Sequence, residues 1–128
     1  MADGPHSKTL RPSVHNSVVT AISGATTITM STTGDDKGRR THGFAAVEFY
    51  SDSGGTTVVE GTAGDLTFTL KTTLLPEQYV AFTNNTVANI LTNTIVSWDA
   101  NTDEVKVVID NVTGDPTHAR LRVIMNGV

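Results

Sequence analysis

Apolar and polar residues alternate along several short stretches of the chain, which is the pattern of strands with one face in a core. The clearest of these stretches are residues 26–31, 44–51, 66–70, 104–110 and 118–126. Clusters of glycine, asparagine and aspartate separate them and are typical of turns. Because no long amphipathic helix pattern accompanies them, the sequence predicts an all-β chain.

The spacing of these stretches predicts how they connect. Residues 44–51 and 56–60, joined by Asp52-Ser53-Gly54-Gly55, are predicted to form a hairpin. Further strands are predicted at 17–22, 77–82 and 88–98, and turns or loops at 33–43, 61–64 and 111–117. About 8–9 short strands with regular turns indicate an antiparallel β-sandwich of jelly-roll-like type.

The N-terminal segment differs from the rest of the chain. Residues 1–16 are polar and irregular, so we predict an extended N-terminal arm, followed by a single β-sandwich domain at 17–128. The arm is interpreted either as a frayed terminus or as a tether that becomes ordered on a partner. The whole chain of 128 residues is long enough to bury a core without metal or disulfide bonds.

Composition agrees with this pattern and excludes several classes of function. The 22 threonines and 15 valines are β-branched and favour strands. A formal net charge of −4 argues against a broad nucleic-acid-binding face, and the absence of cysteine removes disulfides and thiolate metal sites. The chain has no apolar run of membrane-spanning length and no export signal at its start, so we expect synthesis in the host cytoplasm and no membrane partner.

Candidate catalytic and metal sites are weak. Residues 99–103 form an Asp-x-Asn-x-Asp run with Asp110 at the twelfth position, as in a calcium loop, but Glu104 stands where such a loop needs glycine. A polar hairpin turn explains the run better. The histidines have no close histidine partners along the chain: His6, His15, His42 and His118. We therefore predict no catalytic residue, no cofactor and no metal.

Basic residues mark the segments with the best potential for partner contact. Lys37, Arg39 and Arg40 lie in a glycine-rich predicted loop, and Lys8 and Arg11 lie in the arm. The fixed glycine-lysine pattern of a phosphate-binding loop is absent. Arginine is enriched in protein interfaces, so these five side chains are either solvated or contact a protein partner.

Two runs of consecutive apolar residues, 107–109 and 123–125, predict strands that are buried on both faces. In a two-layer sandwich the outer face is normally wet, so either a long loop or another subunit is expected to cover them. The only tryptophan, Trp98, ends an apolar strand and is predicted to lie in the core or in a subunit contact.

The closing segments, Thr94-Ile95-Val96-Ser97-Trp98-Asp99-Ala100-Asn101-Thr102-Asp103 and Thr117-His118-Ala119-Arg120-Leu121-Arg122-Val123, resemble the ends of small β-rich structural proteins of tailed bacteriophages. The resemblance implies a non-enzymatic virion protein of the capsid decoration, head-fibre or tail-associated type. It implies a symmetric homo-oligomer, such as a homotrimer, bound to the major capsid or tail protein. The competing interpretation is a β-sandwich module that binds carbohydrate or a cell surface.

Overall fold

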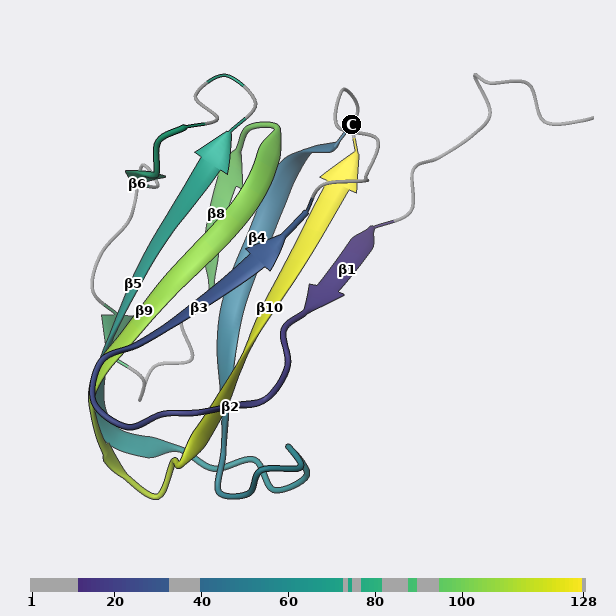
Figure 1. Cartoon of the computed structure of the whole chain (residues 1–128). Coiled ribbons are helices and arrows are strands. Elements are labelled where there is room, and N and C mark those ends of the chain that lie inside the picture. Colours follow the sequence, from purple (N-terminus) through teal and green to yellow (C-terminus); the bar gives the residue numbers. More distant parts are fainter. Residues whose placement is uncertain are drawn as a thin grey trace, which may run out of the picture.

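The computed structural model of the chain describes residues 12–32, 40–72, 74, 77–81, 88–89 and 95–127. These residues form strands and connecting loops without a helix, arranged as two antiparallel sheets packed face to face (Figure 1). The all-β prediction is therefore confirmed. In the part of the chain described, no helix is long and apolar enough to cross a membrane.

The two sheets are named A and B here. Sheet A has the strand order β1-β10-β4-β8, and β2 also pairs with β10. Its strands are β1 (Ser13–Asn16), β2 (Thr20–Ala21), β4 (Arg40–Tyr50), β8 (Val96–Asp99) and β10 (His118–Gly127). Sheet B has the order β3-β9-β5-β6, with β7 also on β5. Its strands are β3 (Thr26–Ser31), β5 (Gly61–Thr72), β6 (Val80–Ala81), β7 (Ala88–Asn89) and β9 (Thr102–Gly114).

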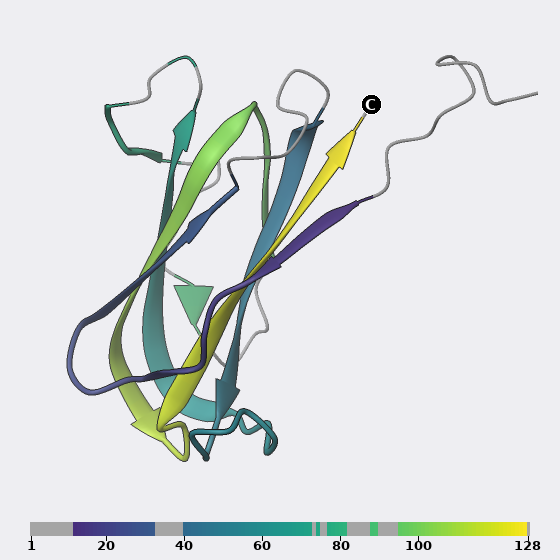
Figure 2. The ribbon, with the colours of Figure 1, turned by 45° about the vertical axis from the view of Figure 1, so that its right-hand side comes forward.

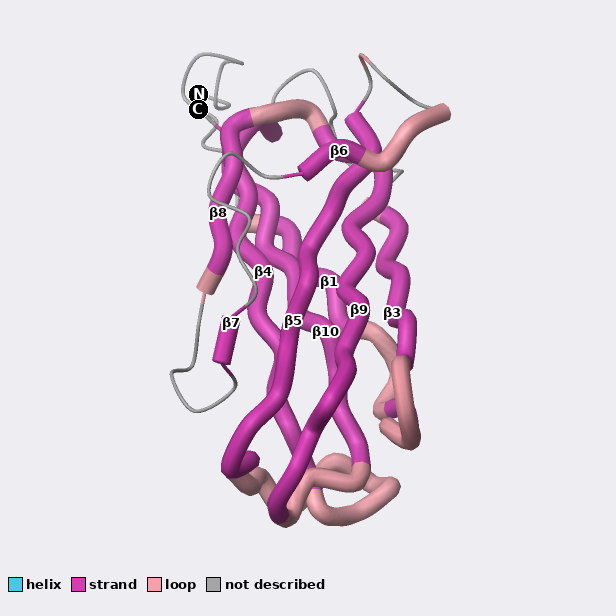
Figure 3. Tube along the Cα trace, turned by 90° about the vertical axis from the view of Figure 1, so that its left-hand side faces the viewer, coloured by secondary structure: helices cyan, strands magenta, loops and turns pink. Residues whose placement is uncertain are grey.

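Several connections pass from one sheet to the other, and the last two strands of the chain pair between strands that precede them in the sequence. Strand β9 lies between β3 and β5, and β10 lies between β1 and β4. Figure 2 shows the two layers side by side, and Figure 3 shows β3, β5 and β9 together in one of them. This is the strand order of a jelly roll. The sequence predicted the sandwich of jelly-roll-like type but not the order of its strands.

Alternating side chains of the long strands fill the space between the sheets. Val105, Val107 and Ile109 of β9 have no exposed surface, and neither do Leu121 and Val123 of β10. A residue two positions further along a strand points to the same face, so this burial is the alternation that the sequence displays. The core is mostly aliphatic, which suits a chain with few aromatic residues.

The boundary predicted between arm and domain is wrong by four residues. Ser13–Asn16 forms β1 and pairs with β10, where Val14 lies opposite Ile124. Ser17 extends this attachment, because its backbone N–H donates to the carbonyl of Leu121 over 2.9 Å and its hydroxyl accepts the N–H of Leu121 over 2.9 Å. The predicted strand at 17–22 is correspondingly reduced to β2.

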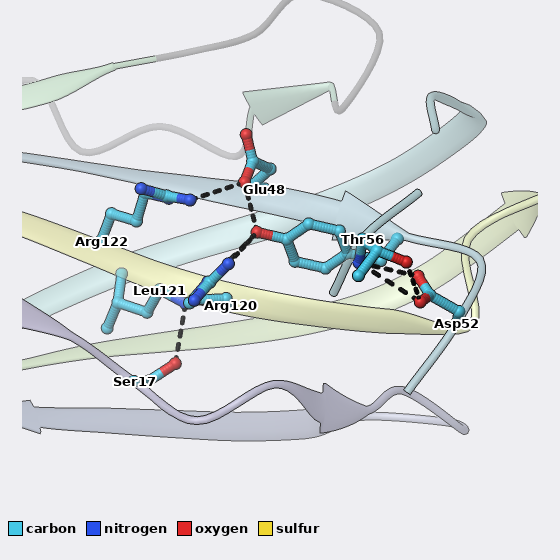
Figure 4. A network of polar contacts seen from close by, with 8 residues as sticks. Ser17, Glu48, Asp52, Thr56, Arg120, Leu121 and Arg122 are labelled. Carbon is cyan, nitrogen blue, oxygen red and sulfur yellow. Dashed lines mark hydrogen bonds and ion pairs between the residues drawn. The ribbon is translucent and has the colours of Figure 1, made fainter. Parts of the chain in front are cut away.

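The hairpin predicted from residues 44–51 and 56–60 differs in the structure, where its second strand is reduced to one bridge. Residues 56–60 form no strand, and a single bridge joins Tyr50 to Val58. The carboxylate of Asp52 accepts the backbone N–H groups of Thr56 and Thr57 over 3.0–3.2 Å, and it also accepts the Thr56 hydroxyl. Two backbone bonds flank the bridge, from Ser51 N–H to the carbonyl of Thr57 over 3.1 Å and from Val59 N–H to the carbonyl of Phe49 over 3.0 Å, and the Asp52 side chain organises the tip of the loop (Figure 4).

The predicted turns at 61–64 and 111–117 lie partly inside strands. Strand β5 begins at Gly61 and β9 continues to Gly114, with irregular register between them. Asn111 and Gly114 take positive φ angles of 54° and 100°, which lets β9 bend while it stays paired. The strands predicted at 77–82 and 88–98 are shortened to β6, β7 and β8 in the described residues.

Candidate partner-binding face

The outer face of sheet B is polar. Its outward residues on β3 and β5 include the threonines Thr27, Thr29, Thr67 and Thr69, of which the Thr69 hydroxyl is buried. Beside them the ammonium groups of Lys71 and Lys106 lie 4.6 and 3.8 Å from the ring centre of Tyr79. The Tyr79 hydroxyl donates a hydrogen bond to Glu104, which raises the pKa of Tyr79 to about 12. This face has the character of a solvated surface.

The outer face of sheet A carries apolar side chains across its strands. Val14 lies opposite Ile124, and Ile124 lies opposite Phe44, so three strands contribute one continuous row. Ala46 and Ile95 extend this row toward β8 and line a shallow hollow of about 270 Å³ with Phe44 and Ile124. We call these five residues the sheet A patch.

Much of the sheet A patch faces solvent. The exposed fractions are 59% for Val14, 66% for Ile95 and 37% for Ile124. The described part of the chain does not by itself bury the second face of β10, because Ile124 points outward. The second face of β9 is covered in part, since Val108 is half-buried. No described loop covers the patch, which leaves the expectation of a neighbouring subunit open.

A network of polar side chains borders one end of the sheet A patch (Figure 4). The Arg122 guanidinium donates to Glu48 over 2.9 Å, and Arg120 donates to the Tyr50 hydroxyl over 2.8 and 3.1 Å. The Tyr50 hydroxyl in turn donates to Glu48. This bond and the nearby Arg122 lower the pKa of Glu48. Two guanidinium groups against one carboxylate give this end a formal charge of +1.

An acidic group borders the opposite end of the patch. His42 Nδ1 contacts a carboxylate oxygen of Asp99, whose side chain is 84% exposed. The His42 ring packs edge-on against Phe44, with the ring centres 4.7 Å apart. Among the side chains described at this end, the Asp99 carboxylate supplies the negative charge. The apolar surface thus lies between a pair of guanidinium groups and an exposed carboxylate.

The basic residues predicted to contact a partner fall almost entirely outside the described residues. Lys8, Arg11, Lys37 and Arg39 are in undescribed segments, and for Arg40 the structure describes the backbone, paired with Gly127 at the start of β4.

The described residues nevertheless locate where the two basic segments join the domain. Ser13 of β1 and Gly43 of β4 lie on either side of Met125 of β10. Both segments therefore attach at the same end of sheet A.

The Asp-x-Asn-x-Asp run is not a hairpin turn, which corrects the sequence interpretation. Asp99 ends β8 in sheet A and Thr102 begins β9 in sheet B, so the run joins the two sheets. Across the described ranges, no group of three or more histidine, aspartate or glutamate side chains is placed to hold a metal ion.

Trp98 lies in the core, as predicted. It is 7% exposed, and its indole N–H donates to the Thr102 hydroxyl over 2.6 Å. Its ring fits against Gly43, where a Cβ atom would lie 2.3 Å from the indole. The tryptophan therefore serves packing between the sheets.

Comparison with known proteins yields one family. Residues 11–127 match the family model described as Domain of unknown function (DUF7265). No curated protein and no solved structure matches the chain.

Proposed function

We propose that this chain, which belongs to the DUF7265 family, is a non-enzymatic structural protein of a virus particle. In this proposal it is made in the host cytoplasm and joins the capsid or tail of the virion as a symmetric homo-oligomer. Its partners are further copies of itself and the major capsid or tail protein. The observation that carries the proposal is the sheet A patch, an exposed apolar surface with charged ends.

An exposed apolar surface that runs across several strands has a physical consequence. Soluble monomers rarely expose large continuous apolar surfaces, and those that do usually use them for binding. Here the patch belongs to the backbone-paired strands β1, β10 and β4, with Ile95 at the start of β8, so its shape is fixed before any partner arrives. A rigid contact surface suits a protein that must hold many symmetric contacts on a particle.

The fold alone does not distinguish between the candidate functions. Jelly rolls occur in viral capsid proteins and in lectins, so function has to be argued from the surface. A carbohydrate-binding module commonly stacks sugar rings on an exposed aromatic side chain. Trp98 and Tyr50 are buried, and Tyr79, which is 37% exposed, has two lysine ammonium groups against its ring. These observations favour the particle protein over the carbohydrate-binding module.

The decisive experiment locates the chain. Particles of the virus that encodes it are purified by density gradient, and the copy number of the chain is measured by quantitative mass spectrometry. Electron microscopy with a tagged chain then gives its position. We expect many copies in symmetric positions on the capsid or tail. A chain that is absent from particles, or that binds a defined glycan on an array, contradicts the proposal.

A further inference from the structure

The polar and apolar layout of sheet A identifies a partner for its outer face. We infer that the sheet A patch of one copy packs against the sheet A patch of a second copy. The two copies are related by a two-fold axis that lies between sheet A of one copy and sheet A of the other. The inference rests on the proposed function, because it specifies the contact through which the homo-oligomer forms. The argument has three parts: position, charge and area.

The positions of the residues on the sheet are set by its register. Arg122 of β10 pairs with Ala46 of β4, Ile124 pairs with Phe44, and His42 of β4 pairs with Asp99 of β8. Phe44 lies on β4. Arg122 lies on the neighbouring strand β10, at the level of the next outward-facing residue of β4, Ala46. Asp99 lies on the other neighbouring strand, β8, at the level of the preceding outward-facing residue of β4, His42. The line from Arg122 to Asp99 passes over Phe44 at its midpoint.

This diagonal makes the face complementary to itself. A two-fold axis in the plane of contact, above Phe44 and perpendicular to the diagonal, places each Phe44 against its counterpart. The same operation places Arg122 of each copy over Asp99 of the other. Because the contact is isologous, the charge pair forms twice. The strands of the two copies then cross at a steep angle, which is one of the two arrangements found for packed sheets.

The apolar and charged groups have different roles in this contact. Exposed ion pairs contribute little to affinity, so most of the free energy comes from the sheet A patch. The paired charges fix the direction of docking, because the alternative arrangements place like charges together or leave them unpaired. Arg122 and Asp99 are available for this role, with side chains 44% and 84% exposed.

The area of the face agrees with a contact of modest strength. Strands spaced at about 4.8 Å and outward residues at steps of about 6.8 Å give a face of roughly 500 Å² in projection. Stable interfaces bury roughly 600–1,000 Å² on each partner. A single contact of this kind therefore dissociates on dilution, whereas on a particle it acts together with the contact of each copy with the capsid or tail protein.

The experiment uses two charge reversals, Arg122→Glu and Asp99→Arg, in the full chain. Each variant alone brings like charges together twice in the homodimer, so we expect self-association to weaken by at least about tenfold. Mixed in equal amounts, the two variants restore both attractive pairs. Native mass spectrometry of the mixture, with one variant isotope-labelled, should show a heterodimer as abundant as the wild-type dimer.

Two controls keep the result interpretable. Circular dichroism and thermal melting establish that each variant is folded, since Arg122→Glu also removes the bond to Glu48. The matched reversals on sheet B, Lys106→Glu and Glu104→Lys, should leave self-association at the wild-type level, alone and mixed.

The outcomes separate the inference from the proposed function. A wild-type oligomer that neither reversal weakens overturns this interface but leaves the proposed function standing. Reversals that weaken assembly without recovery in the mixture overturn the two-fold arrangement. A wild-type chain that is monomeric in solution but present on particles overturns self-contact through the patch, and the particle protein then becomes the occupant of that face. Absence from particles, or binding to a defined glycan, overturns the proposed function itself.

Discussion

Single buried hydroxyl groups in this chain differ in what they contribute to stability. The Thr102 hydroxyl accepts the indole N–H of Trp98 and donates to the carbonyl of Ala100 over 3.0 Å. The Thr32 hydroxyl closes the same corner by donating to the carbonyl of Thr102. By contrast, Thr69 Oγ1 is buried without a hydrogen-bond partner in the described part of the chain.

Thr102 and Thr69 give a matched pair of substitutions to valine. Thr102→Val removes the hydroxyl that accepts the buried indole N–H of Trp98, so we expect the free energy of unfolding to fall by about 1–3 kcal/mol. Thr69→Val removes a hydroxyl that gains nothing from burial and should be neutral or stabilising. Urea unfolding followed by Trp98 fluorescence measures both. Equal losses in the two variants would show that the Trp98–Thr102 bond has no special role.

At the level of strands, the sequence predicts best those strands in which apolar residues that face the core alternate with polar residues that face outward. Strands β5, β9 and β10 could be predicted because their inward residues are apolar and most of their outward neighbours are polar. Strand β1 could not be predicted, since its residues Ser13, His15 and Asn16 show no apolar period and are held by pairing with β10. The return strand predicted at 56–60 is reduced to one bridge at Val58, because the Asp52 carboxylate accepts the backbone N–H groups of Thr56 and Thr57.

The corrected start of the domain predicts two different outcomes of truncation. Removing residues 1–11 leaves β1 in place, so we expect an unchanged melting temperature. Removing residues 1–16 exposes the edge of β10 and should lower the melting temperature by several degrees. If Lys8 and Arg11 contact the particle, the shorter truncation should still abolish attachment. Full decoration of particles by this truncated chain would exclude a role for the arm.

For the whole molecule, the difference between its two outer faces was the least predictable feature. Val14, Phe44 and Ile124 are far apart in the sequence, and only the order β1-β10-β4 makes them neighbours. The consecutive apolar residues at 123–125 predicted that a covered surface exists there. Its extent and the opposite charges at its ends depend on register, which pattern alone does not determine.

The central claim is that the outer face of sheet A, and not that of sheet B, binds other copies of the chain. The direct test is sedimentation equilibrium of the wild type, Ile124→Glu and Val108→Glu, which place the same charge on opposite faces. We predict that the wild type and Val108→Glu self-associate to the same extent and that Ile124→Glu is monomeric. Equal self-association of all three proteins, each shown to be folded by thermal melting, would contradict the claim.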